Sequence, residues 1–224
     1  KHTYQAIENT FNSAEVKRNF EENIIPLFEY FKNKIKIISH GIDLNLFYPK
    51  DKPTDRLTFI ANKGWRNLED RGGIQYLIKA YLEEFTNQEQ VALLVKINPA
   101  YGIPDVNKMI EQLRPKDRID LPLLQFMGDN MPYSELVKVY NMGHVFVSPT
   151  RAEAFGLPMI EAMACALPVL STDFGGQTDF VNESNGWLIG GILKEVEHEI
   201  MYENCSWLEP SINELRAKLR YIYE

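Results

Sequence analysis

The sequence predicts an α/β fold: a doubly wound, Rossmann-like parallel sheet with helices on both faces, accompanied by a short N-terminal piece of another domain. Apolar strand-like runs alternate with amphipathic helical segments along most of the 224 residues. The run "VALLVKI" at 91–97 has no polar alternation, which is typical of a strand buried on both faces. The connections are short, and strands that alternate with helices form parallel sheets.

The first part of the chain is expected to stand apart from the sheet. Residues 13–32 follow a helical pattern that Pro26 interrupts, because proline cannot donate the helix hydrogen bond. Residues 35–39, "IKIIS", predict a strand, and residues 40–49 predict a turn with an extended exit. The polar segment 49–56 contains two prolines and is the best candidate for a linker.

This linker divides the chain into two expected domains, residues 1–50 and residues 51–224. The chain begins with lysine, and its last residues, "LRAKLRYIYE", still follow a helical pattern. We therefore expect the sequence to be part of a longer protein, in which further residues complete the smaller domain.

The larger domain supplies the strands and helices of the sheet. Its strands are expected at residues 57–61, 91–97, 123–128, 144–148, 168–171 and 186–190. Its helices are expected at 73–85, 106–113, 133–142, 157–166 and 210–223, with a short helical turn at 178–182. The helix at 73–85 is the clearest, because one apolar stripe recurs at helical spacing. That stripe comprises Ile74, Leu77, Ile78, Tyr81 and Leu82.

Composition and charge narrow the classes of function. Hydrophobic residues make up 45% and charged residues 25%, a balance that is typical of globular proteins. The formal net charge is −7, which argues against nucleic acid as the main partner, since phosphate backbones require a basic surface. A local basic pocket for one diphosphate remains compatible with that charge.

The two cysteines and the hydropathy pattern indicate the compartment. Cys165 lies in an apolar helix and is expected to be a buried hydrophobic residue, so we expect no disulfide framework. No apolar run is long enough to span a bilayer. We expect a cytoplasmic protein, either free or peripheral at the inner face of the membrane.

Ligands of doubly wound sheets bind beyond the carboxyl ends of the strands, where the strand order reverses. Loops that follow strands are therefore where a site is expected. Three such loops stand out, at residues 62–72, 128–132 and 149–156.

The third loop leads into a helix with a distinctive start. Pro158 suits the first helical turn, and Gly156 allows a ligand to approach the unpaired amides there, which favour an anion. Glu153 lies just outside these amides and Glu161 lies one turn inside the helix. A hydroxyl acceptor, an anion site and a second hydroxyl acceptor match the sugar, diphosphate and ribose of a nucleotide sugar.

Two glutamates by themselves do not establish such a site. The same residues are explained if Glu161 is a solvated helix residue, Glu153 a loop carboxylate and Gly156–Pro158 an ordinary helix start. Short motifs also often match by chance. The surrounding sequence decides between the two interpretations.

The stretch "SPTRAEAFGLPMIEAMACALPVLSTDFGGQTDFVNESNGWLI" resembles the donor-binding domain of the retaining family 4, or group 1, glycosyltransferases. Upstream, "IKIISHGIDLNLFYP" is similar to the hinge between the two domains of that family, and "RGGIQYLIKAY" to a helix after its phosphate loop. The resemblance runs from about residue 13 to the end. It implies the C-terminal lobe of a GT-B fold, with residues 1–50 as the end of the acceptor domain and residues 51–224 as the donor domain.

The resemblance also implies roles for individual residues. Glu153 would contact the donor sugar at the reacting centre as the catalytic glutamate, and Glu161 would hold the ribose hydroxyls. Further donor contacts are implied for Met127 and Gly128 beside the base, for Phe155, Gly156 and Leu157 near the phosphate, and for Gly175 and Gly176 across the pocket.

Two positions depart from the family pattern. Family members carry an arginine and, six residues later, a lysine, and both bind the diphosphate. Arg66 occupies the arginine position, but Gly72 stands where the lysine is expected. Arg71 or Lys63 would then supply the missing cation, and arginine can hold phosphate with two parallel hydrogen bonds. The alternative is an exposed basic loop without a ligand.

The second departure is Ala166, where the helix usually ends in glycine, and we expect it to be tolerated. Trp65 lies in a ligand-side loop and either stacks on a ligand or covers the edge of the sheet. No spacing of His, Cys and Asp indicates a metal site, and neither a metal nor another cofactor is implied.

The sequence thus predicts the donor-binding half of a retaining hexosyltransferase. Its partners would be a UDP-, GDP- or ADP-sugar and a carbohydrate, lipid or protein-linked acceptor, with no nucleic acid. An isolated fragment of this kind would bind donor without transferring sugar efficiently. Two alternatives stay open: another GT-B enzyme, such as an epimerase or phosphorylase, or a nucleotide-binding remnant without catalysis.

Overall fold

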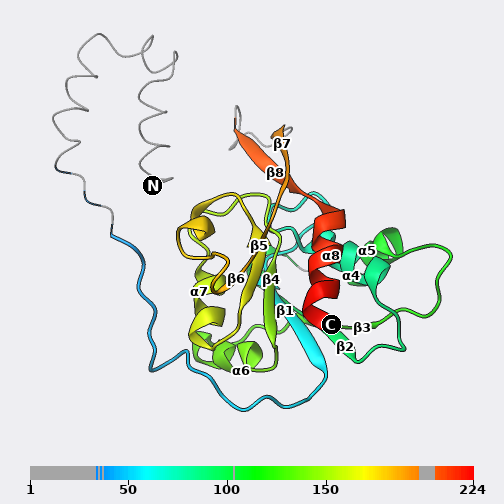
Figure 1. Ribbon diagram of the computed structural model, residues 1–224, viewed down its shortest axis with the longest axis horizontal. Helices are drawn as coiled ribbons and strands as arrows, with labels where there is room; N and C mark the ends of the chain where they lie inside the picture. Colours follow the sequence, from blue (N-terminus) through cyan, green and yellow to red (C-terminus); the bar gives the residue numbers. More distant parts are fainter. Residues whose placement is uncertain (1–33, 35, 37, 103, 197–204) are drawn as a thin grey trace, which may run out of the picture. The chain divides into compact units, whose positions relative to one another are not determined.

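The computed structural model describes residues 34, 36, 38–102, 104–196 and 205–224 (Figure 1). The chain divides into two compact units, Lys1–Gly41 and Ile42–Glu224. The helix predicted at 13–32 lies outside the described residues. Of the strand predicted at 35–39, residues 36, 38 and 39 are described, and none of them is in a strand. Ile38 is 88% exposed, so its side chain is not packed in a core within the described part of the chain.

The larger unit is built on a six-stranded parallel sheet, which confirms the predicted fold class. Its strand order is β3-β2-β1-β4-β5-β6. The strands are β1 (Leu57–Lys63), β2 (Val91–Ile97), β3 (Leu123–Met127), β4 (Val145–Ser148), β5 (Val169–Thr172) and β6 (Gly186–Ile189). The chain adds strands outward from β1 on one side and then resumes on the other, so the order reverses between β1 and β4.

Helices cover both faces of this sheet (Figure 1). They are α4 (Ile74–Glu84), α5 (Val106–Leu113), α6 (Leu136–Tyr140), α7 (Leu157–Ala164) and α8 (Ile212–Tyr223). The cluster of buried residues on one face includes α4, α5 and α8, and the cluster on the other includes α6 and α7. Short 3-10 turns lie at Pro99–Tyr101 (η1), Tyr133–Glu135 (η2) and Gly176–Asp179 (η3).

The strands feed alternate side chains into these two layers of core. In β1, Phe59 belongs to the layer under α4 and its neighbour Ile60 to the layer under α7. All seven residues of β2 are buried, Lys96 included, as the lack of polar alternation predicts. The predicted stripe of α4 is also confirmed, since each of its five residues is at most 1% exposed.

The helix α7 ends two residues earlier than predicted. Its last carbonyls accept from the amides of Ala166 and Leu167, in the pattern that closes a helix with a left-handed residue. Ala166 is that residue, with φ of 58°, in the position where glycine is usual. The predicted helix at 133–142 is also shorter, because its first turn is the 3-10 turn η2.

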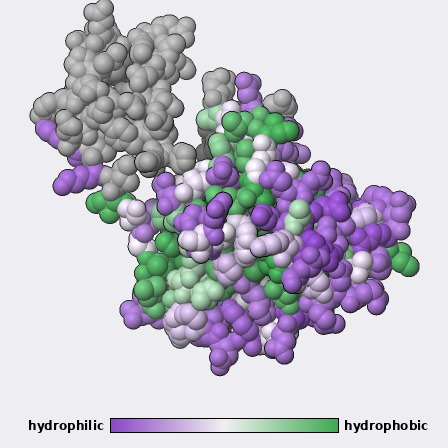
Figure 2. Space-filling view, in the orientation of Figure 1, coloured by the Kyte–Doolittle hydropathy of each residue, from purple (hydrophilic) through white to green (hydrophobic). Residues whose placement is uncertain are grey.

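A two-stranded antiparallel sheet was not predicted. It pairs β7 (Gly191–Glu195) with β8 (Ser206–Pro210), and the predicted start of α8 at Pro210 falls in β8 instead. Ser211 caps α8, because its side chain accepts a hydrogen bond from the Glu214 amide. Hydrophobic residues gather on the surface of this hairpin, where Ile192 and Leu193 are exposed (Figure 2).

The larger unit begins before the predicted linker. Phe47 is fully buried in the core under α7, and the Lys50 amide donates to Asn141 Oδ1 at 2.6 Å. The Asn141 side-chain amide donates in turn to the Tyr48 carbonyl. The expectation that everything before residue 51 packs poorly on the sheet domain is therefore wrong for residues 42–50. The assignment of the preceding residues to an acceptor domain stays a prediction.

Candidate functional site

The candidate site lies at the carboxyl ends of β1 and β4. These two strands are neighbours, and the strand order reverses between them. Loops at such a reversal splay apart and leave room for a ligand, which is why doubly wound sheets bind there. β1 runs two residues beyond its predicted end, so Lys63 is its last residue and faces the loop that follows β4.

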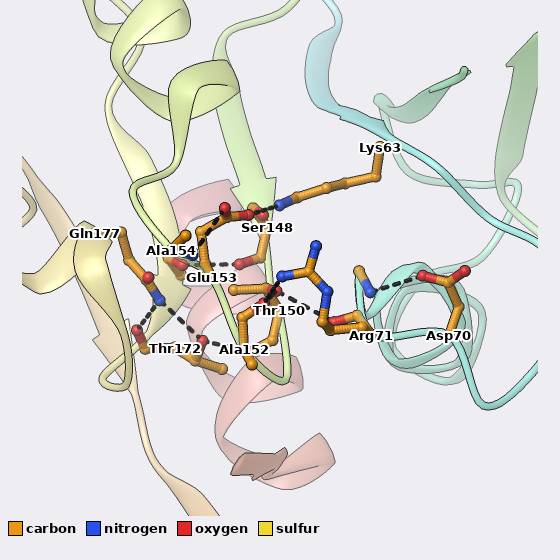
Figure 3. Close-up of polar contacts among 12 residues, drawn as sticks. Lys63, Asp70, Arg71, Ser148, Thr150, Ala152, Glu153, Ala154, Thr172 and Gln177 are labelled. Atoms are coloured by element: carbon orange, nitrogen blue, oxygen red, sulfur yellow. Dashed lines mark hydrogen bonds and ion pairs between the residues drawn. The ribbon is translucent and has the colours of Figure 1, made fainter. Parts of the chain in front are cut away.

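Lys63 and Glu153 form an ion pair across this position (Figure 3). Lys63 Nζ lies 2.5 Å from Glu153 Oε2, and the two side chains are 9% and 15% exposed. Both residues were predicted site residues, but their pairing was not predicted. A mostly buried lysine and carboxylate at this place put one positive and one negative group where a ligand would enter.

Burial of Glu153 opposes its ionisation, but the nearby cations prevail. The charge of Lys63 and its hydrogen bond, followed by the charge of Arg71, hold the pKa of Glu153 below its usual value. The carboxylate is therefore ionised at neutral pH and acts as a hydrogen-bond acceptor only.

The predicted basic residues of the first loop have different positions. Arg71 Nη1 donates to the Ala152 carbonyl at 2.8 Å, which places this guanidinium next to Glu153 (Figure 3). Arg66 is exposed, and its amide donates to Asp70 Oδ2. Asp70 also accepts from the amide of Gly72, the residue that replaces the usual lysine. The structure thus groups Lys63 and Arg71 with Glu153, whereas the exposed side chain of Arg66 lies near Gly102.

Two glycines shape the other side of the site. Gly156 precedes α7 with φ of 101°, a left-handed conformation that favours glycine. A Cβ on Gly176 would lie 1.9 Å from the Ala154 carbonyl oxygen, so the turn with Gly175 can approach the loop only as glycine. The Gly176 amide donates to the Glu153 carbonyl at 2.9 Å. The predicted glycine turn therefore packs directly on the predicted sugar-binding loop.

Glu161, the second predicted glutamate, lies in a different environment. It is 4% exposed, and its two oxygens accept hydrogen bonds from two tyrosines. Tyr140 donates to Oε2 at 2.5 Å and Tyr133 donates to Oε1 at 2.6 Å. Asn62, next to Lys63 at the end of β1, donates to the Tyr140 hydroxyl at 2.9 Å. This network could not be predicted from local sequence patterns, because its members are distant along the chain.

The network leaves the pKa of Glu161 above its usual value. Burial raises this pKa, and the hydrogen bonds from Tyr133 and Tyr140 offset only part of that effect. Burial and the neighbouring carboxylate also raise the pKa of Tyr140 well above its usual value. Burial and the hydrogen bond to Glu161 raise the pKa of Tyr133 as well, so both tyrosines act as hydrogen-bond donors to Glu161 throughout the neutral range.

Arg151 is a residue of this region that sequence reasoning missed. Its side chain is 4% exposed, and it forms ion pairs with Glu209 at 2.6 Å and Glu69 at 3.2 Å. Its guanidinium also lies 3.8 Å from the centre of the Trp207 ring. The available signal was the position of a basic residue two places before Glu153, beside a buried strand.

Arg151 links the site loop to two other segments, the loop before α4 and the strand β8. Its amide donates to the Arg71 carbonyl, and its carbonyl accepts from the Leu208 amide of β8. The side chain reaches the loop before α4 through Glu69. The unpredicted hairpin is thus part of the support for the loop that carries Glu153.

The remaining predicted residues occupy the borders of the region. Phe155 packs its ring against Phe180 at 5.2 Å between centroids, and Leu157 is 45% exposed at the start of α7. Met127 and Gly128 lie at the end of β3, two strands away from β1. Trp65, which could have stacked on a ligand, is instead fully buried and stacked on Phe126.

A pocket of about 320 Å³ lies elsewhere, at the amino ends of β5 and β6, between Pro168 and Trp187. It contains none of the predicted site residues, and its Asn185 side chain is already bonded to the backbone of Phe180 and Asn182. We therefore place the site by topology and charge rather than by this hollow.

Two features are absent from the described residues. Within them, no three His, Cys, Asp or Glu side chains are grouped so that they could hold a metal ion. No helix in the same part of the chain is both long and apolar enough to cross a bilayer. Cys165 is buried, as predicted, and neither Cys165 nor Cys205 forms a disulfide.

Two curated proteins illustrate the sequence relationships. The chain is 24% identical over 184 residues to a probable sucrose-phosphate synthase of Thermosipho melanesiensis, and the match covers 80% of this chain and 42% of that protein. It is 30% identical over 200 residues to a D-inositol 3-phosphate glycosyltransferase of Corynebacterium glutamicum, covering 80% and 46%. The chain thus spans less than half the length of these relatives.

Solved structures share the fold. The C-terminal domain of a group 1 family glycosyltransferase from Francisella tularensis superposes with a TM-score of 0.58 at 21% identity, covering 81% of this chain and 87% of that one. A glycosyltransferase from Rickettsia africae gives a TM-score of 0.59 at 20% identity, covering 88% and 50%. At these identities the likeness is evidence for the fold.

The family is shown by a match to the sequence model of "Glycosyl transferases group 1" over residues 66–195. That span is more than half of the chain, and it contains both glutamates, the glycine turn, Arg71 and Arg151. The chain belongs to the group 1 glycosyltransferases.

Proposed function

We propose that this chain is the C-terminal, donor-binding half of a retaining hexosyltransferase that uses a nucleotide diphosphate sugar. The observation that carries the proposal is the Lys63–Glu153 pair at the reversal of strand order, next to the glycine-led start of α7. Membership of the group 1 glycosyltransferases supports the transfer of a sugar.

In the proposed complex the diphosphate lies between the start of α7 and the cations of the first loop. The helix presents amides without intrahelical acceptors, and Lys63 and Arg71 supply positive charge at neighbouring positions. Negative charge that develops on the leaving diphosphate is then stabilised by groups already in place. This arrangement needs no cofactor.

The two glutamates divide the rest of the donor between them. Glu153, which is ionised and lies beside Lys63, accepts from the hydroxyl groups of the sugar near the reacting carbon. Glu161 accepts from the ribose. The loop at Met127 and Gly128 borders the base. Holding the donor at both ends keeps the anomeric carbon of its sugar within reach of the acceptor hydroxyl.

The chain spans less than half of its curated relatives, so the activity of a whole protein is also part of the proposal. We propose that an N-terminal domain binds a carbohydrate, lipid or protein-linked acceptor, and that the enzyme works in the cytoplasm or at the inner face of the membrane. The chain alone is then expected to bind donor without efficient transfer.

Binding of the donor is tested by following the melting temperature of the 224-residue chain with UDP-, GDP- and ADP-sugars. We expect at least one of them to raise the melting temperature, and Lys63→Met to abolish that shift. Lys138→Met is the matched control, because Lys138 pairs with Glu135 on an exposed helix surface. No shift with any nucleotide sugar, or equal shifts in both variants, would contradict the proposal.

The reaction class is tested in the complete enzyme by the configuration of the transferred sugar, measured by NMR. Retention of the donor's anomeric configuration is expected. Formation of a sugar phosphate from inorganic phosphate would instead indicate a phosphorylase. Formation of an epimerised nucleotide sugar would indicate an epimerase.

A further inference from the structure

The two oxygens of Glu161 differ in how accessible they are to a ligand. Oε2 accepts from Tyr140, which is fully buried and whose hydroxyl also accepts from Asn62. Oε1 accepts from Tyr133, whose side chain belongs to a residue that is 54% exposed. A ligand approaching from solvent therefore meets Oε1 and the Tyr133 hydroxyl before it meets Oε2.

The two tyrosines also differ in how firmly they are held. Tyr140 packs between Phe47 and Phe146 in the core, with ring centroids 5.9 and 5.8 Å away. Tyr133 lies on the 3-10 turn η2 and makes an edge-on contact with Phe47 at 5.2 Å. Its exposed ring can rotate toward solvent without opening the core, whereas the ring of Tyr140 cannot.

Glu161 itself is only 4% exposed, and the Tyr133 hydroxyl already occupies Oε1 as its hydrogen-bond donor. A buried carboxylate oxygen without a donor is costly, and the tyrosine hydroxyl supplies that donor when no ligand is present. A ligand hydroxyl that binds Oε1 has to take the place of the tyrosine hydroxyl.

We propose that Tyr133 is a latch on Glu161: its hydroxyl occupies Oε1 in the empty site and is displaced by a ribose hydroxyl of the bound nucleotide. This inference rests on the proposed function. Tyr133 is a positioning residue, because it acts through Glu161, and it lowers nucleotide affinity by competing for the same oxygen. Tyr133 directly follows the loop at residues 127–132, where the base is expected.

The test is calorimetry of the chain and its Tyr133→Phe variant with UDP, GDP and ADP. Loss of the competing hydroxyl should tighten binding of the preferred nucleotide about three- to tenfold, since one net hydrogen bond changes an affinity by about that factor. The same variant should gain nothing with the 2′,3′-dideoxy form of that nucleotide, which has no ribose hydroxyl to use Oε1. A merely structural role of Tyr133 would change both ligands alike.

Two variants serve as controls. Tyr221→Phe removes the hydroxyl of another exposed tyrosine, on α8, and should leave both affinities unchanged. Tyr140→Phe removes the buried donor to Oε2 and should lower the melting temperature without a gain that depends on the ribose hydroxyls.

The latch is overturned if Tyr133→Phe leaves the affinity of the ribonucleotide unchanged, weakens it, or tightens the dideoxy form equally. These results leave the proposed function intact when the chain still binds the nucleotide and Glu161→Gln weakens that binding. If the unsubstituted chain binds none of the three nucleotides, the proposed function fails and the latch fails with it.

Discussion

Glu153 and Glu161 are the same residue type on adjoining segments, yet the structure gives them opposite surroundings. Glu153 follows β4 in a loop and is neutralised by Lys63, with Arg71 nearby. Glu161 lies within α7 and is surrounded by hydroxyl groups, with no cation among its pKa determinants. Accordingly, the pKa of Glu153 is lowered and that of Glu161 is raised.

This difference separates two ways of presenting a carboxylate to a ligand. At Glu153 the charge is compensated by a neighbouring cation, so a ligand with both a sugar and a phosphate can exchange partners with the pair. At Glu161 the charge is only solvated by protein hydroxyls, so a ligand hydroxyl can replace one of them at little electrostatic cost. The first arrangement suits a reacting centre, and the second suits a fixed point of attachment.

The largest expected effect is on the support of the Glu153 loop. Arg151→Met leaves Glu209 without its closest cation and removes the contact with Trp207, so the free energy of unfolding should fall by about 3–5 kcal/mol. Urea unfolding measures this. Arg114→Met is the control, because Arg114 pairs with Glu111 on the surface and should cost less than about 1 kcal/mol. Equal losses of stability in the two variants would contradict the claim that Arg151 supports the Glu153 loop.

The second effect concerns the Glu161 network. Glu161→Ala leaves the buried Tyr140 hydroxyl without its acceptor, so stability should fall by about 1–3 kcal/mol. Glu161→Gln keeps one acceptor oxygen and should lose less, as measured by thermal and urea unfolding. A fully stable Glu161→Ala variant would mean that the network contributes nothing to folding.

The third effect is a pH dependence of opposite sign for the two glutamates. Because the folded pKa of Glu153 lies below its ordinary value of 4.5, its stabilisation is present above that pH and is lost as the pH falls through the folded pKa. Because the folded pKa of Glu161 lies above 4.5, its contribution is full below that pH and is lost as the pH rises through the folded pKa.

Urea unfolding of the chain, Glu153→Gln and Glu161→Gln at a series of pH values measures these contributions. Glu153→Gln should reduce the loss of stability on acidification, and Glu161→Gln should reduce the loss on raising the pH above 4.5. The same sign for both substitutions would contradict the comparison.

The smallest expected effect tests whether the stability of the end of α7 and the binding role of Glu161 are independent. Ala166→Gly relieves the left-handed alanine at the end of α7 and should stabilise the chain by about 0.5–1 kcal/mol. It does not alter the contacts of Glu161, so nucleotide affinity should stay the same in calorimetry. Ala164→Gly is the opposing control, because it puts glycine inside the helix and should destabilise it. A changed affinity in Ala166→Gly would show that Glu161 depends on the helix end.

Much of the fold could be predicted from the sequence, because its elements are encoded locally. The apolar run of β2 and the stripe of α4 depend only on residues within each element. The β7–β8 hairpin was missed because the exposed strand Gly191–Glu195 shows no alternation of apolar and polar residues. The turn around Phe47 was assigned to the wrong side of the boundary because its burial depends on contacts with residues about ninety positions away.

The candidate site was predicted in its members and only partly in its arrangement. Motif spacing singled out Glu153 and Glu161, the family resemblance added the glycine turn, and the predicted topology put the basic loop at the same edge of the sheet. The partners of both glutamates could not be predicted, since Lys63 and Glu153 are ninety residues apart and Tyr140 has an ordinary helix position. Arg151 was missed for the same reason, because its partner Glu209 lies 58 residues away in the unpredicted hairpin.

The central claim is that the two glutamates bind different parts of the donor. It is tested by calorimetry of Glu153→Gln and Glu161→Gln with the preferred nucleoside diphosphate and with its nucleotide sugar. Glu161→Gln should weaken both ligands about ten- to a hundredfold, since a charged acceptor contributes about 1.5–3 kcal/mol. Glu153→Gln should leave the diphosphate bound nearly as before and weaken only the nucleotide sugar. Equal losses for both ligands in both variants would contradict the account.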